Sequence, residues 1–102
     1  MNNGLSMVGL ATRAGKTVSG EFATEKSIKE GKAKVVIVAK DASDNTKKLF
    51  QNKCDYYRVP IFITGTKDEL GSVTGNQSRA SLAVIDHGFA KAIIEKLGVQ
   101  EL

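Results

Sequence analysis

A run of four β-branched apolar residues, Val35 to Val38, constrains the fold of this chain more than any other feature. A strand with one face in solvent alternates polar and apolar residues, but this run contains no polar residue. The run therefore predicts a strand that is covered on both faces. Helices on the two sides of a sheet provide such cover, so the run favours an α/β fold.

The residues before this strand predict a shorter strand and a helix with defined ends. Thr17 to Ser19 favour extended backbone, and Gly20 provides the turn at which a helix begins. Glu21 suits the positive N-terminal end of that helix, and Gly31 stands where a glycine commonly ends one. The stretch therefore predicts a strand, a helix and a buried strand in succession.

The rest of the chain continues this alternation of helices and strands. Thr66 and Glu69 match the pattern of a capping box, so a short helix is expected to begin there. The other expected elements are a helix ending near Arg13, a helix over 44–57, a strand over 61–64, a polar loop over 75–80, a strand over 81–85 and a last helix ended by Gly98. This order predicts one domain spanning 1–102, a three-layer α/β/α sandwich with a mixed sheet of about four strands.

Apolar residues recur at helical spacing in the helix expected over 44–57. Its inner face is predicted to consist of Thr46, Leu49, Phe50, Cys54 and Tyr57. Cys54 is therefore expected in the core. It is the only cysteine and the chain has only one histidine, so neither a catalytic thiol nor a metal site is expected.

Composition limits the class of protein without identifying the function. The hydrophobic fraction of 41% and the charged fraction of 25% are ordinary for a soluble protein. No apolar run is long enough to span a bilayer, no signal peptide is recognisable, and a single cysteine fits a reducing compartment. We therefore expect a cytoplasmic protein without a membrane partner. The net charge of +4 favours an acidic partner such as nucleic acid.

Motifs of catalysis are absent from the sequence. It contains no G-x-x-x-x-G-K-[ST] or G-x-G-x-x-G phosphate loop, no G-x-S-x-G and no metal-ligand spacing. Asp41 ends a buried strand, as the acceptor aspartate of a receiver domain does, but the N-terminal region lacks the acidic pair that receivers need. The sequence therefore predicts no enzyme, no cofactor and no small-molecule substrate.

The helix that begins after Gly20 has two unlike sides. The side expected to pack contains Ala23, Thr24, Ser27, Ile28 and Gly31. Phe22, Lys26 and Lys29 lie on the opposite side, where lysines can neutralise phosphates and an aromatic ring can stack on an unpaired base. Taken alone, these three residues favour a simpler interpretation, a solvated charged face with one exposed apolar residue.

Two separated stretches resemble the kink-turn-binding ribosomal proteins of the L-seven-Ae and L-thirty-e types. These are G-E-F-A-T-E-K-S-I-K-E-G-K-A-K-V-V-I-V-A-K-D over 20–41 and L-G-S-V-T-G-N-Q-S-R-A-S-L-A-V-I-D over 70–86. Within this superfamily the sequence is most similar to the small bacterial YlxQ-like subgroup. The resemblance implies a protein that recognises a structured, sharply bent RNA, for which ribosomal RNA is the expected source.

The resemblance also implies which residues face the RNA. A helix start and an adjacent loop grip the RNA in this superfamily, and Lys26 matches a phosphate-binding lysine. The residues predicted on this basis are Gly20, Glu21, Phe22, Ala23, Lys26, Lys29, Lys32, Asn76, Gln77, Ser78 and Arg79.

One departure from the superfamily changes the expected mode of recognition. Kink-turn binders of the L-seven-Ae type carry an Asn-Glu pair at the positions of Phe22 and Ala23, where it contacts sheared G·A pairs. We therefore expect Phe22 to stack on a base and do not expect ordinary kink-turn readout. A protein-interaction module on the same fold is the alternative, with Phe22 as the anchor in a partner's pocket.

Overall fold

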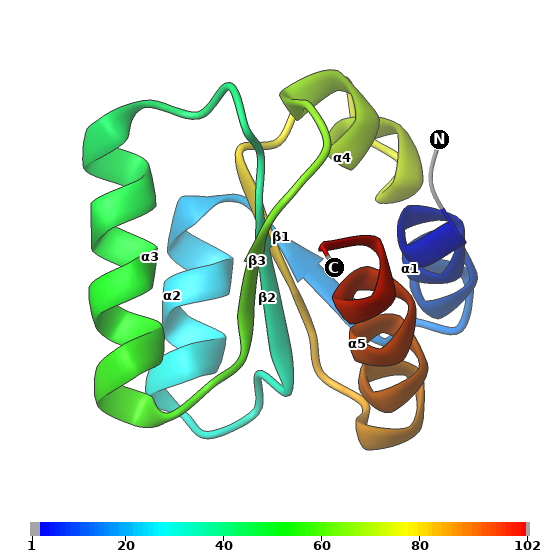
Figure 1. Cartoon of the computed structure of the whole chain (residues 1–102), viewed down its shortest axis with the longest axis horizontal. Helices are drawn as coiled ribbons and strands as arrows, with labels where there is room; N and C mark the ends of the chain where they lie inside the picture. Colours follow the sequence, from blue (N-terminus) through cyan, green and yellow to red (C-terminus); the bar gives the residue numbers. More distant parts are fainter. Residues whose placement is uncertain (1–2, 102) are drawn as a thin grey trace.

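The computed structural model describes residues 3–101 and the side chains of residues 3–98. Its elements are α1 (Asn3–Arg13), β1 (Thr17–Ser19), α2 (Glu21–Lys29), β2 (Val35–Val38), α3 (Asp44–Tyr57), β3 (Ile61–Ile63), α4 (Lys67–Val73), β4 (Ser81–Val84) and α5 (His87–Glu101). Helices α2 and α3 cover one face of the sheet, and α1 and α5 cover the other (Figure 1). The predicted three-layer α/β/α sandwich is confirmed.

The four strands form one mixed sheet in the order β1-β4-β2-β3. Strand β4 pairs antiparallel with both β1 and β2, whereas β2 and β3 are parallel. The two central strands, β2 and β4, are buried at every residue. The two-sided burial predicted for Val35 to Val38 follows from this central position.

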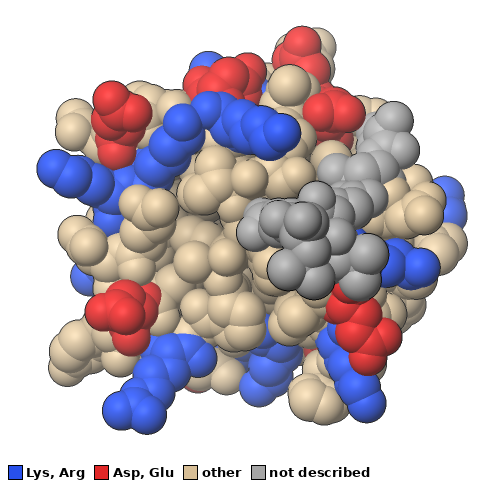
Figure 2. All heavy atoms as spheres, viewed as in Figure 1, with Lys and Arg blue, Asp and Glu red and all other residues tan. Residues whose placement is uncertain are grey.

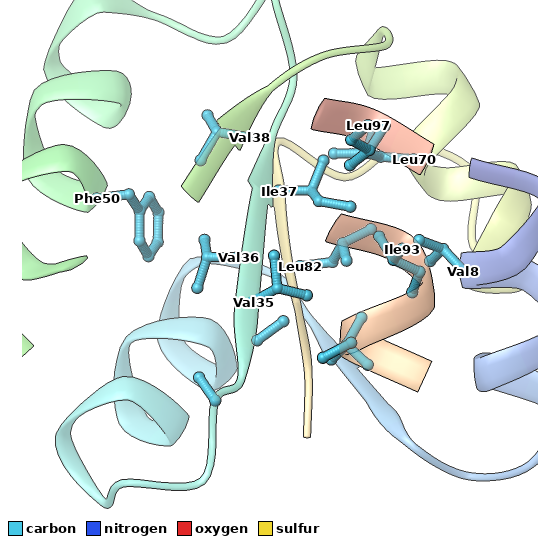
Figure 3. Packing of buried hydrophobic residues seen from close by; sticks show 14 of the residues in the cluster. Val8, Val35, Val36, Ile37, Val38, Phe50, Leu70, Leu82, Ile93 and Leu97 are labelled. Carbon is cyan, nitrogen blue, oxygen red and sulfur yellow. The ribbon is translucent and has the colours of Figure 1, made fainter. Parts of the chain in front are cut away.

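Apolar side chains fill the space on both sides of the central strands. Phe50 of α3 lies against the side of β2 that carries Val36 and Val38 (Figure 3). On the other side Ile37 faces α5, where Ile93 is fully buried. Burying one large apolar side chain such as Phe50 or Ile93 stabilises the fold by roughly 1.5–3 kcal/mol. The helices are therefore held to the sheet mainly by apolar packing against its two faces.

Two expectations about helix ends and faces are wrong. Tyr57 is 41% exposed, because it is the last residue of α3 and the chain leaves the helix at Arg58, which adopts a left-handed conformation with a φ of 59°. Helix α5 runs through Gly98 to Glu101. Glycine permits a helix to end but does not force it to, and Gly98 lacks the positive φ that Gly31 has at the end of α2.

Side chains cap the starts of α3 and α4, and the capping box predicted at Thr66 is confirmed. Ser43 caps α3 by accepting a hydrogen bond from the backbone N–H of Thr46 at 3.1 Å. Thr66 and Glu69 exchange both hydrogen bonds of a capping box at the start of α4. Over the part of the chain that the structure describes, no helix is long and apolar enough to span a bilayer.

Candidate nucleic-acid interface

The first turn of α2 presents backbone N–H groups that none of the described side chains caps. Gly20 precedes the helix with a φ of 92°, and no side-chain hydrogen bond is found at this start within the described part of the chain. The backbone N–H of Gly20 donates to the carbonyl oxygen of Ser81 at 2.9 Å, which attaches the start of α2 to β4. Uncapped N–H groups together with the helix dipole attract anions.

The two sides of α2 differ as the sequence predicted. Thr24, Ser27 and Ile28 are buried, and the hydroxyl of Ser27 donates to the carbonyl oxygen of Thr24 at 2.7 Å. On the opposite side, the ring of Phe22 is 80% exposed, and Lys26 is exposed one turn further along. The helical phase is therefore confirmed, except that Gly31, expected on the packed side, is exposed.

The loop over 75–80 lies beside the start of α2 and is attached to it through Ser19. The Nε atom of Arg79 donates to the Ser19 hydroxyl oxygen at 3.2 Å, and the Nδ2 atom of Asn76 donates to the same oxygen at 3.3 Å. A further bond joins Arg79 Nη2 to Asn76 Oδ1 at 3.1 Å. Ser19 is the last residue of β1, so this network sets the spacing between the loop and α2.

The network divides the predicted loop residues into two kinds. Asn76 and Arg79 direct their polar groups to other residues of the protein, so their immediate effect is to hold the loop. Gln77 and Ser78 are exposed at its tip. The sequence reasoning missed Ser19, because a serine at the end of a strand carries no signal for a contact 60 residues away.

Helix α4 supports the loop from the other side. A Cβ atom at Gly71 would lie 2.6 Å from the carbonyl carbon of Gln77 and from the backbone nitrogen of Ser78. The backbone N–H of Arg79 also donates to the carbonyl oxygen of Lys67 at 3.0 Å. Only glycine permits this approach, so Gly71 is a second residue of the site that the sequence reasoning missed.

The lysines of the surface differ in their ion pairs. Lys29 lies 3.9 Å from Glu25, and Lys32 lies 3.5 Å from Glu30. Among the side chains described, Lys26 has no carboxylate within ion-pair distance. Exposed ion pairs are weak, so Lys29 and Lys32 can exchange their carboxylate partners for phosphates. Lys26 can bind a phosphate without first breaking an ion pair.

The net charge is not gathered into one large patch on the face that Figure 2 shows. Basic and acidic side chains are interspersed around its rim, and uncharged residues lie between them (Figure 2). On this face, attraction for an anion therefore depends on individual basic side chains.

Groups suited to metal or thiol chemistry are not assembled here. Within the described residues, no three His, Cys, Asp or Glu side chains are placed to hold a metal ion. Burial raises the pKa of the Cys54 thiol to about 11, and the residue is 1% exposed. A thiol in that state is protonated at neutral pH and is a poor nucleophile.

The chain is similar to a known family and to several known proteins. Residues 2–94 match the family described as "Ribosomal protein L7Ae/L30e/S12e/Gadd45 family". The chain is 43% identical to the RNA-binding protein YlxQ of Bacillus subtilis over 91 residues, which cover 89% of this chain and 91% of that protein. It is 33% identical to the large ribosomal subunit protein eL8 of Thermoplasma volcanium over 82% of this chain and 70% of that protein.

A solved structure has the same fold. The structure of a protein of unknown function from Bacillus halodurans superposes with a TM-score of 0.91 at 32% identity, and covers 96% of this chain and 99% of that one. The match to the family model alone spans most of the sequence. The chain therefore belongs to the ribosomal protein L7Ae/L30e/S12e/Gadd45 family.

Proposed function

We propose that this protein binds a structured RNA, with ribosomal RNA as the preferred ligand, and that it catalyses no reaction. The observation that carries the proposal is the uncapped start of α2, which has the unpaired Lys26 and the exposed Phe22 beside it and lies against an anchored loop. The cytoplasm is the proposed site of action, where ribosomal RNA would be available.

Each part of the surface has a distinct role in this proposal. The N–H groups at the start of α2 and the ammonium group of Lys26 bind phosphate oxygens. The ring of Phe22 stacks on an unpaired base, and the exposed tip of the loop at Gln77 and Ser78 contacts a neighbouring nucleotide. The names of the relatives support an RNA ligand, since one is called RNA-binding and another is a ribosomal protein.

Recognition is expected to differ from ordinary kink-turn binding. Phe22 and Ala23 offer neither the amide nor the carboxylate that the resembled kink-turn binders use on sheared G·A pairs. Stacking on a ring tolerates many sequences, whereas paired hydrogen bonds to base edges do not. We therefore propose that a generic kink-turn binds more weakly than the natural RNA.

The experiment is RNA crosslinking and sequencing from cells, followed by titration of the recovered fragment. Lys26→Ala should weaken binding to all RNAs alike and lower the salt slope by about one. Phe22→Ala should leave the salt slope unchanged and weaken binding only to RNAs that offer an unstacked base. Recovery of no enriched RNA, or wild-type affinity in both variants, would refute the proposal.

The exposed Phe22 ring also favours a second candidate, a protein-interaction surface. An aromatic side chain that is 80% exposed is a typical anchor for a partner's pocket. The two candidates differ in a simple measurement. The chain has no tryptophan and absorbs weakly at 280 nm, so co-purifying nucleic acid would be evident in the absorbance spectrum.

A further inference from the structure

A groove lies next to the proposed RNA-binding side of α2, on the side toward β1. We call it the β1-side groove and define it by Val18, Phe22, Ala23, Lys26, Lys32 and Ile85, which line it together with Ser27 and Glu30. Its volume is about 320 Å³. That volume lies at the lower end of the range found for small-ligand sites.

The floor of the groove is apolar because of the register of the sheet. Val18 of β1 pairs with Ala83 of β4, and Ile85 follows Ala83 two residues later. Residues two apart on a strand point to the same face, so Val18 and Ile85 lie on the face that α2 covers. Ala23 of α2 is small, so it leaves the space above this floor open.

The walls combine an aromatic ring with cations. Phe22, Lys26 and Glu30 line this groove and also a second hollow on the other side of α2, so they form a ridge between the two. Glu30 is paired with Lys32 at 3.5 Å, whereas Lys26 has no such partner among the side chains described. The groove therefore has an apolar floor, an aromatic wall and a net positive rim.

We propose that the β1-side groove seats one unstacked nucleobase of the bound RNA against the ring of Phe22. The phosphates on either side of that base lie at Lys26 and Lys32. This inference rests on the proposed function and adds to it a place for the base, with Val18, Ala23 and Ile85 as the residues beneath it.

The chemistry of the groove favours a nucleotide over a peptide. Base stacking on an aromatic side chain needs an exposed ring with open space beside it, and an adjoining phosphate needs a nearby cation. Lys26 supplies one without breaking an ion pair, and Lys32 supplies another by exchanging its weak pair with Glu30. A peptide that added to the sheet would pair with β1, which is an edge strand of only three residues. So short an edge offers few backbone hydrogen bonds.

The first test is an NMR titration of the ¹⁵N-labelled protein with a single-stranded uridylate decamer. Uridine bases stack weakly on each other, so this probe presents unstacked bases. We expect amide shifts at Val18, Ala23, Lys32 and Ile85, and much smaller shifts there with a decamer of abasic ribose phosphate. Equal shifts with both probes, or shifts only at 75–80, would overturn the proposal.

The second test is a substitution that fills the β1-side groove with a larger side chain and leaves Phe22 and the lysines in place. Ala23→Leu should weaken binding of the uridylate decamer about tenfold and leave the salt slope unchanged. Ala92→Leu is the matched control, because Ala92 is also a half-buried helical alanine but lies on α5, on the other face of the sheet. Thermal melts of both variants identify any loss of folding.

The outcomes separate this inference from the proposed function. If Ala23→Leu binds the decamer as the wild type does while Phe22→Ala loses affinity, the groove is not the seat of the base, and RNA binding stands. If the wild type binds ribosomal RNA but not the decamer, the groove proposal also fails. If the wild type binds neither RNA, the proposed function fails with it.

Discussion

At the scale of single residues, Phe22 and Ile28 of α2 provide the clearest contrast. Phe22 is 80% exposed and Ile28 is fully buried, although the two lie on the same nine-residue helix. An exposed apolar ring contributes little to the stability of the free protein, and its burial becomes favourable only when a ligand covers it. A buried side chain stabilises the fold whether or not a ligand is bound. The two residues therefore separate binding from stability.

The corresponding prediction is a pair of alanine variants. Ile28→Ala should lower the free energy of unfolding by roughly 2–5 kcal/mol, because it leaves a cavity, and Phe22→Ala should leave it nearly unchanged. Chemical denaturation followed by circular dichroism measures both. Equal destabilisation would mean that Phe22 is a core residue and that the proposed binding side faces inward.

Ser19 is the residue through which the two halves of the surface meet. Ser19→Ala removes the acceptor of the bonds from Arg79 Nε and Asn76 Nδ2, and should lower stability by about 0.5–1.5 kcal/mol. Hydrogen exchange should become faster over residues 75–80, and the affinity for the natural RNA should fall.

A second serine serves as the control for this variant. Ser72 has an exposed side chain on α4, so Ser72→Ala should change neither hydrogen exchange in the loop nor the affinity for RNA. Unchanged exchange over 75–80 in Ser19→Ala would show that Ser19 does not hold the loop.

At the scale of elements, the position of the loop depends on how closely α4 approaches it. Gly71→Ala would place a Cβ atom 2.6 Å from the backbone of Gln77, so the loop must shift. We predict weaker RNA binding together with lower stability, measured by titration and by thermal melting. The atoms that the added Cβ would meet belong to the backbone of the loop, so rotating a side chain cannot relieve the clash.

Another glycine in a helix provides a matched control for that variant. A Cβ atom at Gly9 of α1 would meet no atom within 4 Å. Gly9→Ala should therefore stabilise the protein slightly, by up to about 1 kcal/mol, and leave RNA binding unchanged. If Gly71→Ala behaved in the same way, the close approach of α4 would not matter for the loop.

At the scale of the whole molecule, the distribution of charge and the strand order of the sheet together determine which basic groups can meet the RNA. The net charge is +4, and the basic side chains are interspersed with acidic ones on the face shown in Figure 2. The start of α2 and the loop over 75–80 meet because β1 and β4 are neighbours in the sheet. The α2 helix, the residues just after it and this loop contribute few basic side chains, so binding is expected to involve a limited number of phosphates.

The prediction at this scale concerns the salt dependence of RNA binding. The logarithm of the affinity should fall linearly with the logarithm of the salt concentration, with a slope that corresponds to on the order of three to five phosphates. Titrations at several salt concentrations measure it. Binding that does not change with salt would favour the protein-interaction alternative.

The sequence alone determined the features that depend on neighbouring residues. The burial of Val35 to Val38, the two sides of α2 and the capping box at Thr66 follow from periodicity and end signals over a few residues. The phase of α2 placed Phe22 and Lys26 in solvent correctly, because the spacing of 3.6 residues per turn is local geometry.

Only the tertiary structure decided how distant segments meet. The bond from Arg79 to Ser19 joins residues 60 apart, and it exists because β1 pairs with β4, a pairing that no local pattern specifies. Tyr57 shows the same limit of local patterns, since it continues the helical spacing of α3 but is the last residue of that helix and is 41% exposed. Periodicity predicts which way a side chain points, but burial requires another element on that side.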